Sequence, residues 1–469
     1  MKILFHTGQA ILNFASLINK IGMVITNLKK LAKNDLRKKA LLIAEAGYEA
    51  INIGQVIKLK VKCKNDILKI VADKNTTIAL NLSDFKKIYI IGVGKDSAMA
   101  SISLAKILGK RLTKGIAIDV NIDQQPTTNN LQLLQGTHPV SSLKNIKATK
   151  KIISLAKKAG EDDLVVSFIC GGGSALLCSS ESELKASNTT FKELTNAGAD
   201  IIELNTVRKH LSEVKGGGLA RLIYPATAIS LIVSDVLGND ISMVASGPTV
   251  YDKTTKKDAE FVLKKYGSKS TISGLKLLET ENDEKYFKNT MNILFVSNKD
   301  SLLAMQEMAL KLKLKPKIYS YKLKGEANQV FSKMVKGIKS GDVVLAGGES
   351  TVELNGKNKK LGKAIRQAHG KGGRNQEAVL GFLIKEQLTI SNKRLAVISF
   401  ASDGNDNKTE VAGAIGDTLT LEKVKKLKLN PQNYLDNHDS FNFFQKTKDA
   451  IYASKNNFNV ADLMIVIKD

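Results

Sequence analysis

The 469-residue sequence predicts an α/β protein built around a parallel β-sheet. Short apolar runs alternate with segments of helical spacing over most of the chain. Several runs, such as 164–170 and 228–233, are apolar apart from one serine each, which is typical of strands buried on both faces. Glycine-rich turns follow several of these runs, as expected where a strand leads directly into a helix. We therefore expect a parallel sheet covered by helices on both faces.

The alternating pattern assigns the elements in order. Before residue 252 we expect strands at 87–91, 115–120, 164–170 and 228–233, and helices at 31–50, 97–108, 145–159 and 191–211. Residues 252–288 are polar and charged, and a domain boundary is expected near their end. Beyond it we expect strands at 293–297, 317–321, 343–346, 395–400 and 463–467, and helices at 302–312, 329–338 and 375–386.

The length of the chain predicts more than one domain, because single hydrophobic cores stop growing well below this size. We expect an extra N-terminal segment at 1–30, an N-terminal domain at 31–285 and a smaller C-terminal domain at 286–469. Two α/β units that face each other would leave a cleft, and such clefts are favoured places for a ligand.

The net charge of +26 raises the question of a nucleic-acid partner. Nucleic-acid binding predicts clusters of Lys and Arg with aromatic residues between them. Here Lys is spread over the whole chain, aromatic residues make up 5%, and Trp is absent. We therefore expect no nucleic-acid partner, but a general attraction for anionic substrates.

The N-terminal residues and the cysteines bear on the compartment. Residues 1–27 are fairly apolar, but Lys20 interrupts them and no run is long enough to span a bilayer. They are interpreted as an amphipathic extra helix or a misplaced start, and no membrane partner is expected. Three cysteines without a CxxC pair fit a reducing cytoplasm.

Two glycine turns at strand ends are candidates for phosphate binding. In Gly92-Val93-Gly94-Lys95 a cation stands at a helix start, where a bound phosphate would explain it. The alternative is a tight turn with an exposed lysine, because neither a Walker A loop nor a full dinucleotide fingerprint is present. In Gly171-Gly172-Gly173-Ser174 the backbone can lie against a ligand, and Ser174 can cap a helix or bond a phosphate.

Two further glycine turns carry basic side chains. Arg208 and Lys209 precede Lys215-Gly216-Gly217-Gly218, a mixture that suits an acidic substrate or a glycine-capped helix end. The run Gly370 to Gly373 leads to Arg374 at a helix start. Its guanidinium can fork onto a phosphate or form a surface salt bridge.

Carboxylates after predicted strands complete the candidate set. Asp235 and Asp403 are the best candidates for holding Mg²⁺ or orienting an attacking hydroxyl. Asp240 and Asp406 are second choices, because loop aspartates often cap turns.

The remaining polar residues in strand-end turns are less specific. Glu349 is either a turn residue or a ligand, and His138 is interpreted as structural. The histidines form no metal motif, and no Ser–His–Asp arrangement supports hydrolase chemistry.

The motifs taken together resemble the glycerate 2-kinase family, the class with a C-terminal MOFRL domain. They occur in family order from about residue 31 to the end of the chain. The matching strings are Ile91-Gly92-Val93-Gly94-Lys95, Gly136-Thr137-His138-Pro139, Gly171-Gly172-Gly173-Ser174-Ala175-Leu176, Asn205-Thr206-Val207-Arg208-Lys209, Lys215-Gly216-Gly217, Ser234-Asp235-Val236, Ala245-Ser246-Gly247-Pro248-Thr249, Gly347-Gly348-Glu349-Ser350-Thr351, Gly373-Arg374-Asn375-Gln376-Glu377 and Ser402-Asp403-Gly404.

The resemblance implies a Rossmann-like N-terminal domain, a smaller C-terminal α/β domain and an active site in the interdomain cleft. It implies ATP-dependent phosphorylation of D-glycerate to 2-phospho-D-glycerate with Mg²⁺. The family's essential lysine and arginine look like Lys95 and Arg374. The assembly stays open between a monomer and a homodimer.

This leads to a hypothesis about the site. The ATP phosphates are expected to lie against Lys95, Gly92, Gly94, Gly171, Gly172, Gly173 and Ser174. Mg²⁺ is expected on Asp235 or Asp403, and Arg374 is expected to stabilise the transferred phosphoryl group. The glycerate carboxylate is expected on Arg208, Lys209 or Lys215.

Departures from the family pattern keep two alternatives open. The family usually has an arginine where Gly218 stands, its strings at 403–410 and 454–459 differ here, and residues 1–30 have no counterpart. One alternative is an oxidoreductase of the hydroxypyruvate reductase type, which the missing third glycine and the want of a clear ribose-binding acid disfavour. The other is a catalytically weakened nucleotide-binding relative.

Overall fold

A computed structural model of the chain describes residues 4–6, 23–73, 75–126, 128–267, 276–352, 371–385, 394–407, 410–454 and 459–469. Contacts between residues divide it into two compact units. The described part of the N-terminal unit comprises residues 4–6 and 53–296, and that of the C-terminal unit comprises residues 23–52 and 297–469 apart from the gaps. Each unit is described by itself.

The N-terminal unit is built on a six-stranded sheet in the order β10-β9-β8-β5-β6-β7, and all of its strand pairs are parallel. Its strands are β5 (Lys87–Val93), β6 (Leu112–Asp119), β7 (Leu131–Gln135), β8 (Asp163–Ile169), β9 (Thr227–Val233) and β10 (Thr290–Val296). The order builds outward from β5 in one direction and from β8 in the other, as in doubly wound dinucleotide-binding folds. The predicted parallel sheet and Rossmann-like architecture are confirmed.

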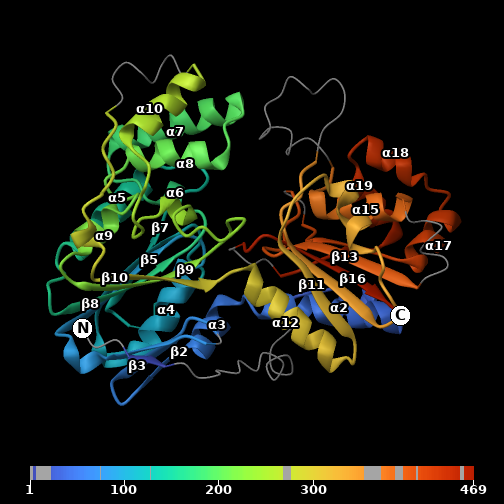
Figure 1. Ribbon diagram of the computed structural model, residues 1–469, viewed down its shortest axis with the longest axis horizontal. Coiled ribbons are helices and arrows are strands. Elements are labelled where there is room, and N and C mark those ends of the chain that lie inside the picture. Colours follow the sequence, from blue (N-terminus) through green and yellow to red (C-terminus); the bar gives the residue numbers. More distant parts are fainter. Residues whose placement is uncertain are drawn as a thin grey trace. The chain divides into compact units, whose positions relative to one another are not determined.

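Helices cover both faces of this sheet (Figure 1). On one face α4 (Ser97–Leu108) packs on β5 and β6, with α3 (Ile53–Lys60) beside it. On the other face α5 (Leu143–Ala156) and α9 (Gly218–Ile223) close a core that includes Ile91, Val165 and Leu222. Every residue of β8 and β9 is buried, which explains why the sequence of these strands is almost entirely apolar.

Two smaller substructures complete the N-terminal unit. A four-stranded antiparallel sheet has the order β1-β4-β3-β2, with β1 (Leu4–His6), β2 (Val61–Lys64), β3 (Ile67–Val71) and β4 (Thr77–Asn81). The strand at 4–6 stands where an amphipathic helix was one reading of residues 1–27; residues 1–3 and 7–22 lie outside the described part. A helical layer contains α7 (Glu181–Ala197), α8 (Ile201–His210) and α10 (Lys256–Lys265).

The single helix predicted at 191–211 is wrong, because α7 ends and α8 begins within it. Gly198 closes α7 in a left-handed conformation with φ of 87°. Asp200 then caps α8 through the Ile202 and Glu203 amides, and Glu203 returns a bond to the Asp200 amide. A glycine followed two residues later by a capping-box aspartate was the signal for this break.

The C-terminal unit is built on a mixed six-stranded sheet in the order β11-β12-β16-β13-β14-β15. Its strands are β11 (Lys315–Leu323), β12 (Asp342–Gly348), β13 (Leu395–Ala401), β14 (Gly413–Gly416), β15 (Ala450–Ile451) and β16 (Asp462–Lys468). Only β11 and β12 pair in parallel, and the last strand of the chain, β16, lies antiparallel between β12 and β13.

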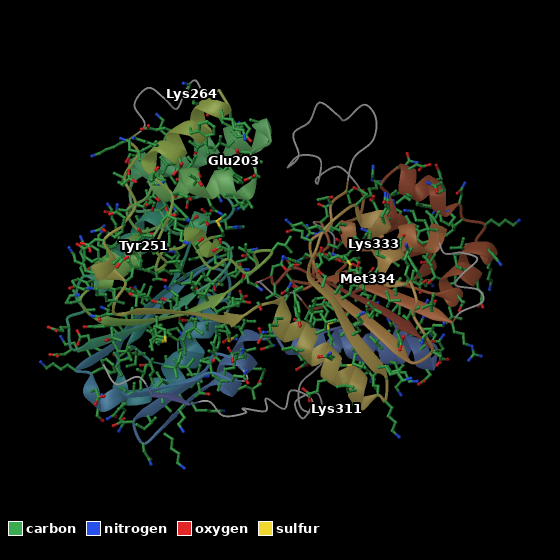
Figure 2. All side chains as sticks on the ribbon, viewed as in Figure 1. Glu203, Tyr251, Lys264, Lys311, Lys333 and Met334 are labelled. Carbon is green, nitrogen blue, oxygen red and sulfur yellow. The ribbon has the colours of Figure 1, made fainter. Side chains whose placement is uncertain are left out.

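Helices cover both faces of the second sheet as well (Figure 1). On one face lie α1 (Leu28–Leu31), α2 (Asp35–Glu49) and α12 (Asn298–Lys311). On the other lie α13 (Val330–Met334), α15 (Arg374–Lys385), α17 (Thr418–Lys426), α18 (Pro431–Asp436) and α19 (Ser440–Thr447). On α13, Met334 is buried in this core while its neighbour Lys333 is exposed (Figure 2).

The contacts group two segments differently from the predicted division at 31–285 and 286–469. Residues 23–52 pack in the C-terminal unit, where Arg37 of α2 is fully buried and binds Asp417 and Asp449. The strand β10, which was expected to open the second domain, is the edge strand of the first sheet. Both segments lie where the chain passes from one unit to the other, and the polar run at 252–288 ends before the second of these passages.

Candidate functional site

The ends of β5 and β8 mark the point where the strand order of the first sheet reverses. The two glycine turns that follow these strands are joined by backbone hydrogen bonds. The Cys170 amide donates to the Val93 carbonyl at 3.0 Å, and the Lys95 amide donates to the Gly171 carbonyl at 3.0 Å. Open parallel sheets bind ligands at this place, outside the carboxyl ends of the strands.

The backbone of the first turn is closely packed against its neighbours. A Cβ at Gly92 would lie 2.5 Å from Ser101 Oγ, and Gly94 has φ of 115° and lies against Cys170. The amides of Gly94, Lys95 and Ser97 already donate to carbonyls. Gly92 and Gly94 allow this tight strand-to-helix turn, as the alternative interpretation expects, and whether they also contact phosphate stays a prediction.

The start of α4, which follows this turn, is already occupied by an acid. Asp119 at the end of β6 is 2% exposed, and its carboxylate accepts hydrogen bonds from the Ala98 and Val120 amides. Burial raises the pKa of Asp119 to about 6, although the Ala98 amide opposes this shift. The positive end of the α4 dipole thus faces a protein carboxylate in place of an external anion.

The second turn, by contrast, has open donors. Within the described part of the chain, the Gly171 and Gly172 amides donate no hydrogen bond. Gly172 has φ of 83°. A Cβ at Gly171 would collide with the Asp235 carboxylate, so a glycine is required for Asp235 to approach. Two free amides and a carboxylate therefore meet at this turn.

Ser174 is held by a chain of hydroxyl and amide groups. Its hydroxyl lies 2.9 Å from the Ser246 hydroxyl, which donates to Asn205 Oδ1 at 2.8 Å. Ala245 and Ser246 both have left-handed backbones, with φ of 51° and 60°. Non-glycine residues adopt this conformation at a cost, and such strain gathers at functional sites. The string Ala245-Ser246-Gly247 thus fixes the second turn to α8.

Two cations without acidic partners flank the second turn. Lys95 and Arg208 are half-buried, and neither forms an ion pair with any residue that the structure describes. Arg208 lies 4.6 Å from the Phe191 ring centroid, and burial lowers its pKa to about 10. A half-buried guanidinium with no carboxylate is unfavourable unless an anion joins it.

His138 was interpreted as structural, but it lies close enough to both cations for their charges to act on it. The position of a Cβ on Gly172 would be 3.3 Å from both His138 Cδ2 and Lys95 Cγ. Burial in this recess, followed by the charges of Lys95 and Arg208, lowers the pKa of His138 to about 4. The imidazole is therefore neutral at neutral pH. We call Lys95, His138, Gly171, Gly172, Arg208 and Asp235 the N-terminal recess.

Lys209 and Lys215, the other predicted substrate cations, are neutralised elsewhere. Lys209 is 4% exposed and binds Asp252 at 2.9 Å. Lys215 is 2% exposed and binds Glu183 at 2.7 Å. Both lysines lie in buried ion pairs that hold α8 and the glycine turn at 215–218 in place. Of the three predicted substrate cations, Arg208 is therefore the one that belongs to the recess.

Arg374 lies at the start of α15 and is surrounded by carboxylates. Its guanidinium forks onto Asp462, with a second contact of 3.2 Å, and binds Glu349 at 2.6 Å. Asp462 is fully buried at the first residue of β16. Burial alone would lower the pKa of Arg374, but the Asp462 and Glu349 carboxylates outweigh it and raise the pKa above its ordinary value. Glu349 is thus a partner of Arg374.

A pocket of about 180 Å³ opens beside this guanidinium. We call it the C-terminal pocket; Arg374, Asp403, Asp406, His438 and Asp462 are among its lining residues. Asp403 lies in its wall, as a metal-binding or base role would require. His438 lies 3.2 Å from Glu377, and this contact raises its pKa.

Asp406, a second-choice catalytic carboxylate, caps α15. It is 2% exposed and accepts from the Asn375 amide at 3.1 Å and the Gln376 amide at 2.9 Å. Burial raises the pKa of Asp406 to about 6. A Cβ at Gly373 would collide with this carboxylate, which explains the glycine. Gly370 lies outside the described residues.

The donor set constrains the way in which a metal ion would bind. Among the residues that the structure describes, no group of three or more His, Cys, Asp or Glu could hold a metal ion. Asp235 and Asp403 stand in separate units and contribute one carboxylate each. No helix in the described ranges is long and apolar enough to cross a bilayer.

Sequence reasoning missed the acids that decide the state of each cation. Asp252, Glu183 and Asp462 lie 43, 32 and 88 residues from their basic partners. It also missed Asn205 and Ser246 as the support of Ser174. Asn205 and Ser246 could have been found from the sequence, because both lie in strings that match the family.

Comparison with known families assigns both halves of the chain. Residues 39–276 match a family described as a domain of unknown function (DUF4147), and residues 342–462 match the MOFRL family. The first match alone covers half of the chain.

Individual relatives cover most of the chain. A D-glycerate 2-kinase of Thermotoga maritima is 30% identical over 84% of this chain and 93% of its own. A putative hydroxypyruvate reductase of Agrobacterium vitis is 32% identical over 84% of this chain and 91% of its own. The crystal structure of a glycerate kinase from Thermotoga maritima superposes with a TM-score of 0.76 at 26% identity, covering 92% of this chain and 99% of that structure.

Proposed function

The chain belongs to the glycerate 2-kinase family, and we propose that it transfers the γ-phosphoryl group of ATP to D-glycerate, forming 2-phospho-D-glycerate. The observation that carries this proposal is the N-terminal recess. Two half-buried cations without acidic partners meet two unengaged glycine amides at the reversal point of a parallel sheet. Such an arrangement is complete only when anions occupy it.

In this proposal the recess holds both reactants by their charges. Lys95 and the Gly171 and Gly172 amides bind phosphate oxygens of ATP, and Ser174 supports the turn that carries these amides. Arg208 binds the glycerate carboxylate through its fork of donors, for which a guanidinium is well suited. Lys209 and Lys215 position these groups without contact to the reactants.

His138 is proposed to bind the hydroxyl of glycerate. Its ring nitrogens form no hydrogen bond with the described residues, and its low pKa keeps one nitrogen available as an acceptor. Asp235, which lies against Gly171, is the other candidate for orienting this hydroxyl. A full general base typically contributes about 10²–10⁴-fold, and a group that only positions the hydroxyl is expected to contribute less.

Arg374 is proposed to stabilise charge on the transferred phosphoryl group. Asp462 and Glu349 hold its guanidinium in one orientation, so little reorganisation is needed when charge develops.

Asp235 and Asp403 are the carboxylates proposed to hold Mg²⁺. Because neither belongs to a cluster of three ligands among the described residues, phosphate oxygens and water would complete the coordination, which is the usual way in which Mg²⁺ binds. When bound, the ion neutralises phosphate charge.

The structure adds an argument against the reductase alternative. In dinucleotide-binding folds the pyrophosphate lies at the N-terminus of the first helix, and an acid after the second strand binds the ribose. Asp119 does follow the second strand, but its carboxylate turns back and caps α4, where the pyrophosphate would lie. Asp119 therefore occupies the place of the pyrophosphate, and its carboxylate is not available to bind a ribose.

A coupled ATP-to-ADP assay with D-glycerate, followed by identification of the product by ³¹P NMR, tests the proposal. We expect ADP formation that depends on D-glycerate and yields 2-phospho-D-glycerate. Absence of turnover would support the catalytically weakened relative, and consumption of NADH with hydroxypyruvate would support the reductase. Either result overturns the proposal.

A further inference from the structure

A second concave site lies in the C-terminal unit and shares no lining residue with the C-terminal pocket. Its volume is about 810 Å³, within the range of small-molecule sites. We call it the lysine groove; its basic lining residues are Lys30, Lys33, Lys423, Lys426, Lys446 and Lys448, and its larger apolar ones are Leu31, Leu427, Phe444 and Tyr452.

The charge of the groove is unbalanced. None of its lining residues is Asp or Glu. Lys423 binds Asp449 at 2.6 Å, and Lys446 donates to the Tyr434 hydroxyl at 2.8 Å. The same Asp449 oxygen is shared with Arg37, so it offers the groove no further negative charge.

The other four lysines of the groove have no acidic partner among the described residues; they are Lys30, Lys33, Lys426 and Lys448. Like charges around one groove repel each other. A multiply charged anion bound there would attract each ammonium group and so offset this repulsion.

The groove is formed by a segment that sequence reasoning set aside as extra. Residues 23–31 dock on the second sheet: Ile25 forms a β-bridge with Ala453, and Asn27 exchanges hydrogen bonds with Ala450 and Tyr452. The docked segment places Lys30 and Lys33 opposite α17 and the end of α19. Its contacts therefore build one wall of the site.

The floor of the groove limits the class of ligand. Carbon atoms make up most of the accessible wall, and the lining residue Leu427 is 47% exposed. Inorganic phosphate would leave this apolar surface in water, whereas a ligand with a flat ring and several negative charges would cover it. We propose that the lysine groove binds a nucleoside polyphosphate, at a site separate from the N-terminal recess and the C-terminal pocket.

Equilibrium dialysis of the full chain with ATP at low ionic strength tests this proposal with a matched pair of double variants. The groove variant is K30E/K426E. The control variant is K29E/K425E, which changes the neighbouring exposed lysines of the same two helices by the same charge without touching the groove. K30Q/K426Q replaces the groove variant if charge reversal prevents folding.

We expect the wild type and the control variant to bind one more equivalent of ATP than the groove variant. The affinity of the groove variant for ATP at this site should fall about ten-fold or more. Equal numbers of sites in all three proteins would overturn the proposal. Displacement of ATP from the groove by tripolyphosphate with the same affinity would also overturn it, because the ring would then contribute nothing. If the catalytic proposal fails while this one holds, the wild type keeps one equivalent and the groove variant keeps none.

Discussion

The N-terminal recess and the C-terminal pocket handle their cations in opposite ways. In the recess Lys95 and Arg208 have no acidic partner among the described residues, and the neutral His138 is within reach of their charges. In the pocket Arg374 is held by two carboxylates. Unpaired cations are available to bind an anionic reactant. A paired cation is fixed in orientation, but its partner carboxylates neutralise its charge. The comparison separates a binding role from an orienting role.

Removal of Lys95 should give the largest effect on activity with little effect on stability. We expect Lys95→Ala to lower kcat/KM about a thousand-fold or more, because it removes a donor that acts on phosphate charge. Steady-state kinetics and urea unfolding check this. Lys106→Ala, an exposed lysine on the same α4, is the control. Near-wild-type turnover of Lys95→Ala would contradict the binding role assigned to the unpaired cations of the recess.

Arg374→Lys should lower both activity and stability. A lysine cannot reproduce the fork onto the buried Asp462, so we expect kcat to fall about a hundred-fold or more and the free energy of unfolding to fall by about 3–5 kcal/mol. The exposed pair Arg394–Asp469 supplies the control Arg394→Lys. If Arg374→Lys changed activity alone, the orienting role of the two carboxylates would be wrong.

Arg208 and its neighbour Lys209 should behave differently although both were predicted to bind substrate. We expect Arg208→Gln to raise KM for D-glycerate about ten- to hundred-fold, since it removes hydrogen bonds to a charged group. Lys209→Met should instead destabilise the fold, because it leaves Asp252 buried without its lysine. Thermal unfolding and KM are measured for both, and a large KM effect confined to Lys209→Met would reverse the assignment.

His138→Gln should lower kcat about ten-fold. Because burial and the nearby cations lower the pKa of His138 to about 4, its titration should leave kcat/KM unchanged between about pH 6 and 8. The pH profiles of the wild type and the variant check this. An inflection near pH 6.5 that disappears in His138→Gln would show an imidazole outside the influence of Lys95 and Arg208.

The buried caps should give the smallest effect, on stability alone. Burial raises the pKa of Asp406 to about 6, above its unfolded value of about 3.9, so the folded state binds the proton more tightly. The resulting stabilisation is present below about pH 4 and is lost as the pH rises through about 6. Asp406→Asn should reduce this pH dependence by about 1–3 kcal/mol in chemical unfolding. The exposed Asp240→Asn serves as control, and identical pH profiles for all three proteins would contradict the assignment.

Much of the fold could be predicted because its signals are local. The apolar runs of β5, β8 and β9 and the helical spacing of α4 each lie within one segment of chain. The break between α7 and α8 was missed although Gly198 and Asp200 carry it. The antiparallel placement of β16 between β12 and β13 depends on contacts with strands far back in the chain, which periodicity does not report.

The candidate site shows the same limit more sharply. The sequence pointed to Lys95, Arg208 and Arg374, but the state of each depends on whether a distant acid reaches it. The glycines have a further role that spacing did not report: Gly171 and Gly373 admit the carboxylates of Asp235 and Asp406, which are not adjacent to them in sequence. Residue type and spacing identify candidate cations, whereas packing decides which of them stay unpaired.

Calorimetric titration of the wild type and of Lys95→Ala/Arg208→Gln with D-glycerate and with a non-hydrolysable ATP analogue tests the central claim most directly. We expect the wild type to bind both ligands, and the double variant to lose D-glycerate and to bind the analogue more weakly with an unchanged unfolding curve. Unchanged affinity of a folded double variant for both ligands would contradict the claim that these unpaired cations receive the reactants.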